Sequence, residues 1–212
     1  MAVTPRIVLA TENAGKVREF EALFGGRLDV STDRRYRAPV EDGSTYAANA
    51  ALKADALASV LGCGRPAVLA DDSGLEVAAL DGAPGIYTAR FGGTGIGWAQ
   101  RRRELLRSLN VLETSDRRAR FVCALHYLAE DGARIAVEGR YEGSIAPQER
   151  GDGGFSFDAI FETPDGRTFA ELAFAEKNDV SHRARAVAVL LQRLVPRGTG
   201  RHGSKDQRVA GT

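Results

Sequence analysis

Short β-rich runs alternate with longer stretches of helical periodicity along the chain. The runs that predict strands are residues 6–10, 28–31, 67–70, 119–128 and 134–141. The stretches that predict helices place apolar side chains on one face, and they begin near Val17, Tyr46, Trp98 and His182. No internal repeat and no linker between two cores is visible. We therefore expect one domain over residues 1–196, followed by a disordered tail over residues 197–212.

The stretch Leu69-Ala70-Asp71-Asp72-Ser73-Gly74 interrupts this pattern, because an apolar run stops at two adjacent carboxylates. A short apolar run bounded by turn residues is typical of a buried strand, so Asp71 and Asp72 are expected where that strand leaves the sheet. In open α/β sheets this position faces the ligand crevice. Two carboxylates so close repel each other, and a divalent cation would offset the repulsion. The alternative is a solvated turn, since these residue types favour turns.

Lys53 conflicts with the apolar pattern of the second predicted helix. At ~100° per residue it falls inside the stripe that contains Tyr46 and Leu57, and Asn49 lies at the edge of that stripe. A lysine on a core face needs an anionic partner, because burial lowers its pKa. Lys53 therefore either extends past the core to water or points into a charged site.

The loop Thr11-Glu12-Asn13-Ala14-Gly15-Lys16 joins the first predicted strand to the first helix. This order places free backbone N–H groups and the positive end of a helix dipole at the loop, and Lys16 adds a formal charge. The loop is therefore a candidate anion site, although it does not match the Walker A pattern. A capped turn with a surface lysine is the other interpretation.

A glycine-rich loop runs from Gly151 to Asp158, and aromatic residues follow its glycines directly. Phe155 or Phe157 could stack on a flat ring, and Asp158 could accept hydrogen bonds from that ring. Entry of the aromatic side chains into the core is the alternative and the commoner fate of phenylalanine.

The last predicted helix begins with charged residues. Ser181 is a good N-cap, which puts His182 and Arg183 in the first turn. Cations are disfavoured at that end of a helix by its dipole. A bound anion or polar ligand would offset this cost.

Bulk composition excludes several functional classes. The chain has 212 residues, of which 43% are hydrophobic and 27% charged, as is ordinary for a globular protein. A formal net charge of +1 gives no overall attraction to nucleic acid or membrane, and the arginines between 101 and 107 are interpreted as a solvated helix face. The first residues lack a signal-peptide pattern, and two cysteines exclude a disulfide framework. We therefore expect a reduced, cytoplasmic protein without nucleic-acid or membrane partners.

Several segments together make the sequence similar to one known family. They are, in chain order, Ala10 to Lys16, Glu41 to Tyr46 leading to Asn49-Ala50 and Lys53-Ala54, Ala70 to Leu75, Gly82 to Tyr87, Gly154 to Asp158, Glu176-Lys177 and Ser181 to Arg183. This combination resembles the inosine triphosphate pyrophosphatase family, the bacterial non-canonical purine nucleoside triphosphate pyrophosphatases.

The resemblance implies an elongated α/β fold with a central mixed sheet flanked by helices, two lobes with a cleft between them, and a homodimer. It implies Mg²⁺-dependent hydrolysis of ITP, dITP and XTP to the monophosphate and pyrophosphate, which cleanses the nucleotide pool. Two alternatives stay open. One is a pyrophosphatase for modified pyrimidine or methylated nucleotides, and the other is a nucleotide-binding module without turnover.

The resemblance also implies roles for individual residues. Asp72, as general base, and Lys53 would be catalytic, and Glu41 and Asp72 would hold Mg²⁺. Lys177 would donate to the six-position keto oxygen of the base. The residues that would bind the substrate are Thr11, Glu12, Asn13, Ala14, Gly15, Lys16, Ser73, Phe155, Ser156, Phe157, Asp158, Lys177, His182 and Arg183.

Some positions depart from the family pattern. Glu12 stands where many relatives have glycine, so its carboxylate is expected to point away from the phosphates. Ala48 replaces a common glutamate, and Ser156-Phe157 replaces the frequent Gly-Tyr or Gly-Trp. The loop around the base is therefore expected to differ in shape.

Overall fold

A computed structural model describes residues 4–194. Six strands form one mixed sheet in the order β2-β1-β3-β4-β5-β6. The parallel part contains β1 (Arg6–Leu9), β2 (Asp29–Thr32) and β3 (Ala67–Val77). The antiparallel part continues from β3 through β4 (Arg118–Leu128), β5 (Arg134–Ile145) and the short β6 (Phe161–Glu162). The predicted tail, residues 197–212, lies outside the described residues.

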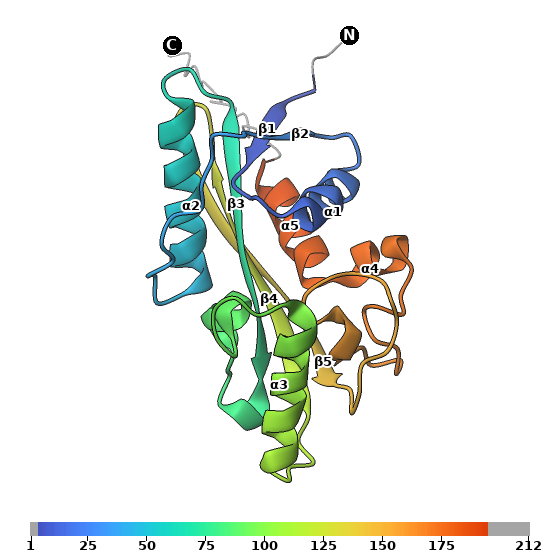
Figure 1. The fold of residues 1–212 in the computed structure, drawn as a ribbon. Helices are drawn as coiled ribbons and strands as arrows, with labels where there is room; N and C mark the ends of the chain where they lie inside the picture. Colours follow the sequence, from blue (N-terminus) through green and yellow to red (C-terminus); the bar gives the residue numbers. More distant parts are fainter. Residues whose placement is uncertain (1–3, 195–212) are drawn as a thin grey trace, which may run out of the picture.

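Helices cover both faces of the sheet (Figure 1). On one face lie α1 (Ala14–Phe24) and α5 (His182–Leu194), and α2 (Tyr46–Leu61) covers the other. Asn13 caps the start of α1, and Gly25 ends it with a left-handed φ of 53°, which a glycine adopts without strain. Thr45 caps α2, and its side chain accepts from the backbone N–H of Ala48.

The long strands β3, β4 and β5 run through the length of the elongated molecule (Figure 1). Below the α1, α2 and α5 layers they carry a second core against α3 (Trp98–Val111), built around Leu75, Leu105 and Phe121. The remaining elements are η1 (Ala78–Leu80), η2 (Gly85–Arg90), η3 (Asp158–Ile160) and α4 (Phe174–Val180). The predicted α/β class with a central mixed sheet is therefore confirmed, and the single domain over residues 1–196 stays a prediction.

β3 is longer than the sequence pattern predicted. The strand was expected to end at Ala70, but it continues to Val77, and Asp71 and Asp72 pair with Leu125 and Ala124 of β4. That prediction was wrong because pairing with a long neighbouring strand outweighs the local turn preference of polar residues. β1 ends at Leu9, so within residues 4–194 no strand covers the other edge of β3 from Asp71 to Gly74. The two carboxylates lie at this open edge.

The arginines of α3 also differ from the expected solvated face. Arg101 is buried and donates to the backbone carbonyls of Phe91 and Gly93. Only Arg103 and Arg107 are exposed, in agreement with the prediction. Among the helices of the described part of the chain, none is long and apolar enough to cross a membrane.

Candidate functional site

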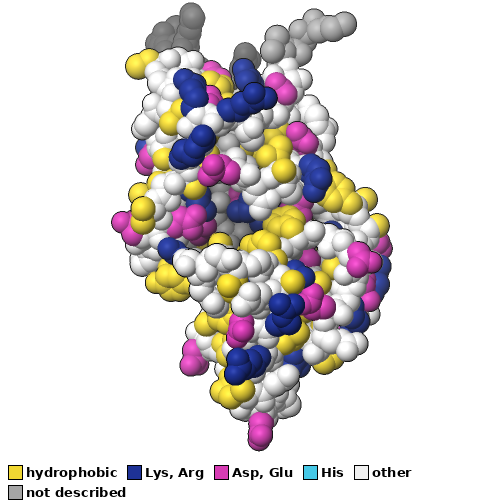
Figure 2. Space-filling view, viewed as in Figure 1, with side chains coloured by type: hydrophobic (Ala, Val, Ile, Leu, Met, Phe, Trp, Pro, Cys, Tyr) yellow, Lys and Arg dark blue, Asp and Glu magenta, His cyan; other side chains and the backbone are white. Residues whose placement is uncertain are grey.

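A cavity of about 400 Å³ lies beside the open edge of β3, and we call it the site pocket. Figure 2 shows a hollow at the waist of the molecule, bordered by acidic and basic side chains. Residues from α1, α2, α3, α5, β3 and η2, and from three loops, line it. The lining residues with polar or aromatic side chains include Thr11, Glu12, Asn13, Lys16, Tyr36, Glu41, Lys53, Asp71, Asp72, Ser73, Thr88, Trp98, Phe155, Ser156 and Arg183.

Lys53 points into this pocket. Its Nζ lies 2.7 Å from Asp72 Oδ1 and 2.8 Å from Glu41 Oε1, and it donates to the backbone carbonyl of Asp71 at 3.3 Å. Burial disfavours the charged ammonium, but Asp72 and Glu41 outweigh burial and raise the pKa of Lys53 to about 12. Lys53 therefore carries a positive charge beside two carboxylates.

Asn49 links Asp72 of β3 to the loop that carries Glu41. One turn of α2 separates it from Lys53, so both side chains reach Asp72, and Asn49 Nδ2 donates to Asp72 Oδ2 at 3.4 Å. Asn49 Oδ1 accepts from the backbone N–H of Gly43 at 2.9 Å, which fixes the loop that carries Glu41. A Cβ at position 43 would lie 2.6 Å from Asn49 Oδ1, so only glycine fits this contact.

Asp71 contacts a different set of cations on the opposite face of β3. Its carboxylate pairs with Lys16 of α1 and accepts from Arg183 Nε of α5 at 3.3 Å. Ser73 Oγ donates to Asp71 Oδ2 at 2.6 Å. Burial raises the pKa of Asp71, but Lys16 and Arg183 outweigh burial and hold it well below its usual range. Asp71 is therefore a fixed negative charge.

The pKa of Asp72 moves in the other direction. Burial raises it, and Lys53 offsets only part of this effect. From the sequence, we expected a metal because the carboxylates of Asp71 and Asp72 would repel each other. This reason was wrong, because each of the two carboxylates is paired with a cationic side chain on its own side of the strand. Asp72 is the carboxylate that accepts a proton more readily.

Beside the site pocket lies a buried cluster of ion pairs. Lys177 Nζ lies 2.8 Å from Glu19 Oε1 and 2.6 Å from Asp158 Oδ2, and Arg183 NH1 lies 2.9 Å from Glu19 Oε2. The Phe155 ring covers both cations, with Lys177 Nζ 4.8 Å and Arg183 Cζ 5.2 Å from its centroid. Phe155 also lines a second cavity of about 560 Å³, together with Gly15, Glu19, Phe169 and Lys177. Phe155 thus borders both cavities.

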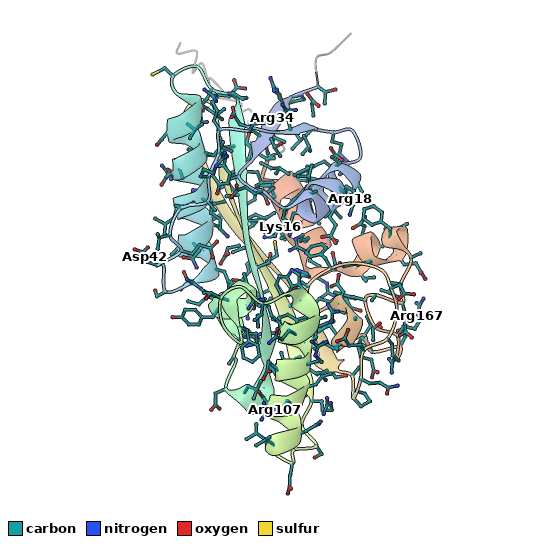
Figure 3. All side chains as sticks on the ribbon, in the orientation of Figure 1. Lys16, Arg18, Arg34, Asp42, Arg107 and Arg167 are labelled. Carbon is teal, nitrogen blue, oxygen red and sulfur yellow. The ribbon has the colours of Figure 1, made fainter. Side chains whose placement is uncertain are left out.

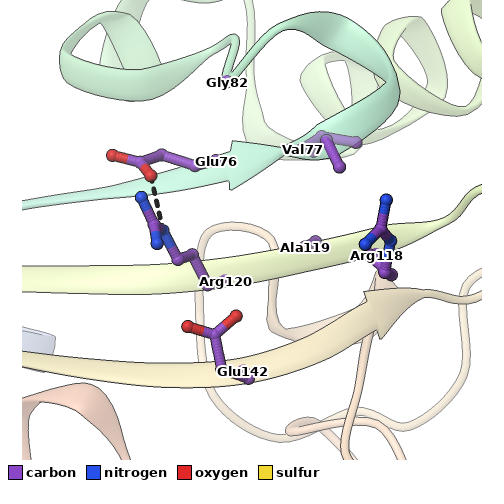
Figure 4. A pocket seen from close by; sticks show the side chains of 8 residues that line it. Glu76, Val77, Gly82, Arg118, Ala119, Arg120 and Glu142 are labelled. Atoms are coloured by element: carbon purple, nitrogen blue, oxygen red, sulfur yellow. Dashed lines mark hydrogen bonds and ion pairs between the residues drawn. The ribbon is translucent and has the colours of Figure 1, made fainter.

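A third cavity, of about 340 Å³, lies away from these groups near the end of β3. Figure 4 shows Arg120 between Glu76 and Glu142, and Arg120 Nε lies 2.7 Å from Glu76 Oε2. None of the residues predicted for the site lines this cavity.

Comparison with known proteins shows the family to which the chain belongs. The model of the Ham1 family matches residues 7–193. The chain belongs to the Ham1 family. A dITP/XTP pyrophosphatase from Thioalkalivibrio sulfidiphilus is 46% identical over 89% of this chain and 98% of its own length. Another dITP/XTP pyrophosphatase, from Geobacillus kaustophilus, is 47% identical over 87% of this chain and 91% of its own length.

Solved structures of the Ham1 family share the fold. The HAM1 protein from Coxiella burnetii superposes with a TM-score of 0.79 at 37% identity, over 90% of this chain and 98% of that one. The Ham1 protein from Staphylococcus aureus gives a TM-score of 0.76 at 37% identity, over 89% of this chain and 97% of that one. The resemblance drawn from the sequence motifs is confirmed.

Most residues that the Ham1 resemblance assigns to the site line one of the two neighbouring cavities, but four do not. Phe157 is fully buried in the second core, the one built against α3, and its ring lies edge-on to Trp98 with 5.6 Å between the ring centroids. Asp158 is buried beneath Lys177, and His182 is buried against the Phe121 ring at 4.7 Å. Ala14 is the fourth. Of the two aromatics left open by the sequence, Phe155 reaches the pocket and Phe157 enters the core.

The loop from Thr11 to Lys16 differs in detail from the expected anion site. Asn13 Oδ1 accepts from the backbone N–H groups of Gly15 and Lys16 at 2.8 and 3.3 Å, so these two donors are already used. Attraction of an anion therefore depends on the Lys16 side chain, which points toward the waist of the molecule (Figure 3). Glu12 Oε2 accepts from Ala38 N at 3.3 Å, although Glu12 still lines the pocket.

The sequence interpretation missed Glu19 and Tyr36. Glu19 offsets the charges of Lys177 and Arg183, and with Asp71 it supplies the anions that the start of α5 needs. Its spacing of four residues from Leu23, on the apolar stripe of the first predicted helix, was a usable signal, because a charged residue beside an apolar stripe marks a conflict, as at Lys53. Tyr36 stands in a loop without periodicity, which gave no signal.

Proposed function

We propose that this chain hydrolyses the non-canonical purine nucleoside triphosphates ITP, dITP and XTP to the monophosphate and pyrophosphate, and so cleanses the nucleotide pool. The main support for this proposal is that Glu41, Lys53 and Asp72 converge in a pocket that Lys16 and Arg183 also line. Cations suit the phosphates, and carboxylate oxygens suit a metal and an attacking water. Relatives 46% and 47% identical over most of their length carry the name dITP/XTP pyrophosphatase.

The proposed chemistry assigns separate tasks to the charged groups. Asp72 accepts a proton from the water that attacks the α-phosphorus, and its raised pKa suits a general base. Lys53 and Lys16 neutralise charge on the phosphate oxygens as the transition state forms. Asp71 keeps Lys16 and Arg183 in place from the other side of the strand.

We propose that Glu41 and Asp72 hold Mg²⁺. Both carboxylates lie within 2.8 Å of the same ammonium, so their oxygens converge on one region that a cation already occupies. Within residues 4–194 no group of three or more His, Cys, Asp or Glu side chains is arranged to hold a metal. Two carboxylates suffice for Mg²⁺, which keeps several waters and takes phosphate oxygens as ligands. When bound, Mg²⁺ would offset negative charge on the phosphates.

Base selection is proposed to depend on Lys177 and Phe155. Lys177 is a charged donor beneath the Phe155 ring, and a donor suits the six-position keto oxygen of hypoxanthine or xanthine but not the amino group of adenine. Phe155 is half-buried and borders both cavities, so its ring can stack on a base.

The test is kcat/KM for ITP, XTP, dITP, ATP and GTP with Mg²⁺, with pyrophosphate and orthophosphate detected separately. We expect pyrophosphate release, with ITP, dITP and XTP preferred over ATP and GTP. Release of orthophosphate alone would contradict the proposed bond cleavage. Preference for a modified pyrimidine or methylated nucleotide would support the alternative pyrophosphatase, and tight binding without turnover would support a binding module.

We further propose that the chain forms a homodimer and acts in the cytoplasm, where nucleotide pools are found. The support for both statements is the family resemblance. Light scattering of the purified protein is expected to give twice the monomer mass, and a monomer at micromolar concentration would contradict the dimer.

A further inference from the structure

We propose that the Tyr36 hydroxyl binds the triphosphate, by donating a hydrogen bond to one of its phosphate oxygens in the site pocket. This inference rests on the proposed function and adds a residue to the phosphate-binding set. Tyr36 lines the site pocket, and its hydroxyl oxygen is buried with no hydrogen-bond partner among residues 4–194. An unpaired buried hydroxyl lowers stability, so its presence in the pocket calls for a partner that arrives with the ligand.

The ring of Tyr36 is fixed by the apolar core. It is 2% exposed and packs in the cluster beneath α2, which includes Val8, Ala54, Leu57 and Ala70. A ring held in this way presents its hydroxyl in one direction, at little further entropic cost when a ligand binds.

The backbone around Tyr36 is also held in place. Tyr36 N donates to the carbonyl of Asp33 at 3.1 Å, and Asp33 Oδ1 accepts from Arg35 N at 2.8 Å. On the other side, Ala38 N donates to Glu12 Oε2. Glu12 therefore ties the loop from 33 to 38 to the start of the phosphate-binding loop.

The Tyr36 hydroxyl stays protonated, so its partner in the pocket has to be an acceptor such as a phosphate oxygen. Lys53, Glu12 and Glu41 are close enough to act on its pKa, but burial dominates and raises the pKa of Tyr36 to about 12. The phenol therefore remains a hydrogen-bond donor at neutral pH. Lys53 and Lys16 line the same pocket and attract polyphosphate, which brings an acceptor oxygen to this neutral donor.

Tyr36→Phe removes only the hydroxyl, and Tyr46→Phe is the matched control. Tyr46 has the second buried tyrosine hydroxyl without a partner in the described chain, but it does not line the site pocket. The probe is inorganic tripolyphosphate, titrated calorimetrically into the wild type and both variants with Mg²⁺. We expect Tyr36→Phe to weaken tripolyphosphate binding about tenfold, the value of one hydrogen bond to a charged group, and Tyr46→Phe to leave it unchanged.

Two further measurements exclude a merely structural role. The thermal midpoint of free Tyr36→Phe should equal or exceed that of the wild type, because no hydrogen bond is lost. KM for dITP should rise about tenfold with kcat nearly unchanged, as when uniform binding is removed. If wild-type protein binds tripolyphosphate but does not release pyrophosphate from dITP, the proposed function fails and the titration still decides on Tyr36.

Three binding results would overturn the inference. They are unchanged tripolyphosphate affinity in Tyr36→Phe, equal weakening in Tyr46→Phe, and absence of tripolyphosphate binding by the wild type. A lowered thermal midpoint of free Tyr36→Phe would also overturn it, because the hydroxyl would then have a partner inside the protein.

Discussion

Asp71 and Asp72 are neighbours in the sequence, but their carboxylates lie on opposite faces of β3. Asp71 pairs with Lys16 and Arg183 on the side of α1 and α5, and Asp72 pairs with Lys53 on the side of α2. Because the edge of β3 is open here, both border the site pocket. One side chain is a permanently charged anchor for two cations, and the other is the candidate base.

The opposite pKa shifts of the two aspartates predict opposite effects of neutralisation on stability. Asp71→Asn should lower the free energy of unfolding by about 3 kcal/mol, because Lys16 and Arg183 lose a buried partner. Asp72→Asn should leave it unchanged or raise it, since burial disfavours the charge of Asp72. Urea unfolding at pH 7 measures both. Equal loss in the two variants would contradict the assignment of Asp71 as the anchor.

For turnover, in contrast to stability, the substitution of Asp72 should have the larger effect. Asp72→Asn should lower kcat for dITP by a factor of about 10²–10⁴, the usual contribution of a general base, while the nucleotide still binds. Single-turnover kinetics combined with calorimetric binding separates the two effects. A near-normal rate in Asp72→Asn would remove this residue from the mechanism.

The acidic residues at positions 41 and 42 offer a matched test of the metal site. Glu41 contacts Lys53 in the pocket, whereas Asp42 is exposed and points outward (Figure 3). Chelation of divalent cations should abolish pyrophosphate release, and added Mg²⁺ should restore it. Glu41→Gln should raise the Mg²⁺ concentration for half-maximal rate about tenfold, the scale of one lost charge-assisted contact, and Asp42→Asn should not. The same Mg²⁺ requirement in both variants would count against Glu41 as a ligand.

The sequence predicted the parts of the site that depend on local pattern. Lys53 was recognisable because a lysine on an apolar helical stripe needs an anion, and its partners Asp72 and Glu41 were among the predicted residues. The choice between Phe155 and Phe157 was not local, since it depends on Trp98, more than fifty residues earlier.

Other features depended on pairing between distant segments. The continuation of β3 through Asp71 and Asp72 follows from β4, which provides backbone partners that the local turn preference does not reveal. The role of Glu19 appears only when α1 meets α4 and α5, because Lys177 and Arg183 are more than 150 residues away in the chain.

Lys177 provides a test of base selection. Lys177→Met should lower kcat/KM for dITP about tenfold or more relative to dATP, because the charged donor beneath Phe155 is lost. Tripolyphosphate affinity should change much less, since Lys177 does not line the site pocket. Arg18→Met is the control, because Arg18 lines the same second cavity but is exposed. Equal loss for every nucleotide would contradict a role in reading the base.

The pH dependence of stability should depend on His182. Burial, followed by the nearby charges of Arg183 and Lys177, holds the pKa of His182 well below 6.5, although Asp71 acts in the opposite direction. His182 Nδ1 is also buried without a partner in the described chain. Below pH 6.5 the unfolded chain therefore binds a proton at this residue that the folded chain does not bind, and the free energy of unfolding falls as the pH is lowered.

The expected slope from this one group is about 1.4 kcal/mol per pH unit below pH 6.5. His182→Phe keeps a ring to stack on Phe121 and removes the proton, so it should lose this part of the slope between pH 6.5 and 5. His126→Phe is the control, because the pKa of His126 is lowered by burial and Arg134 but less strongly, and the slope should change less. Urea unfolding at several pH values gives the slopes. An identical slope for His182→Phe and the wild type would show that His182 is protonated in the folded protein, against the burial seen here.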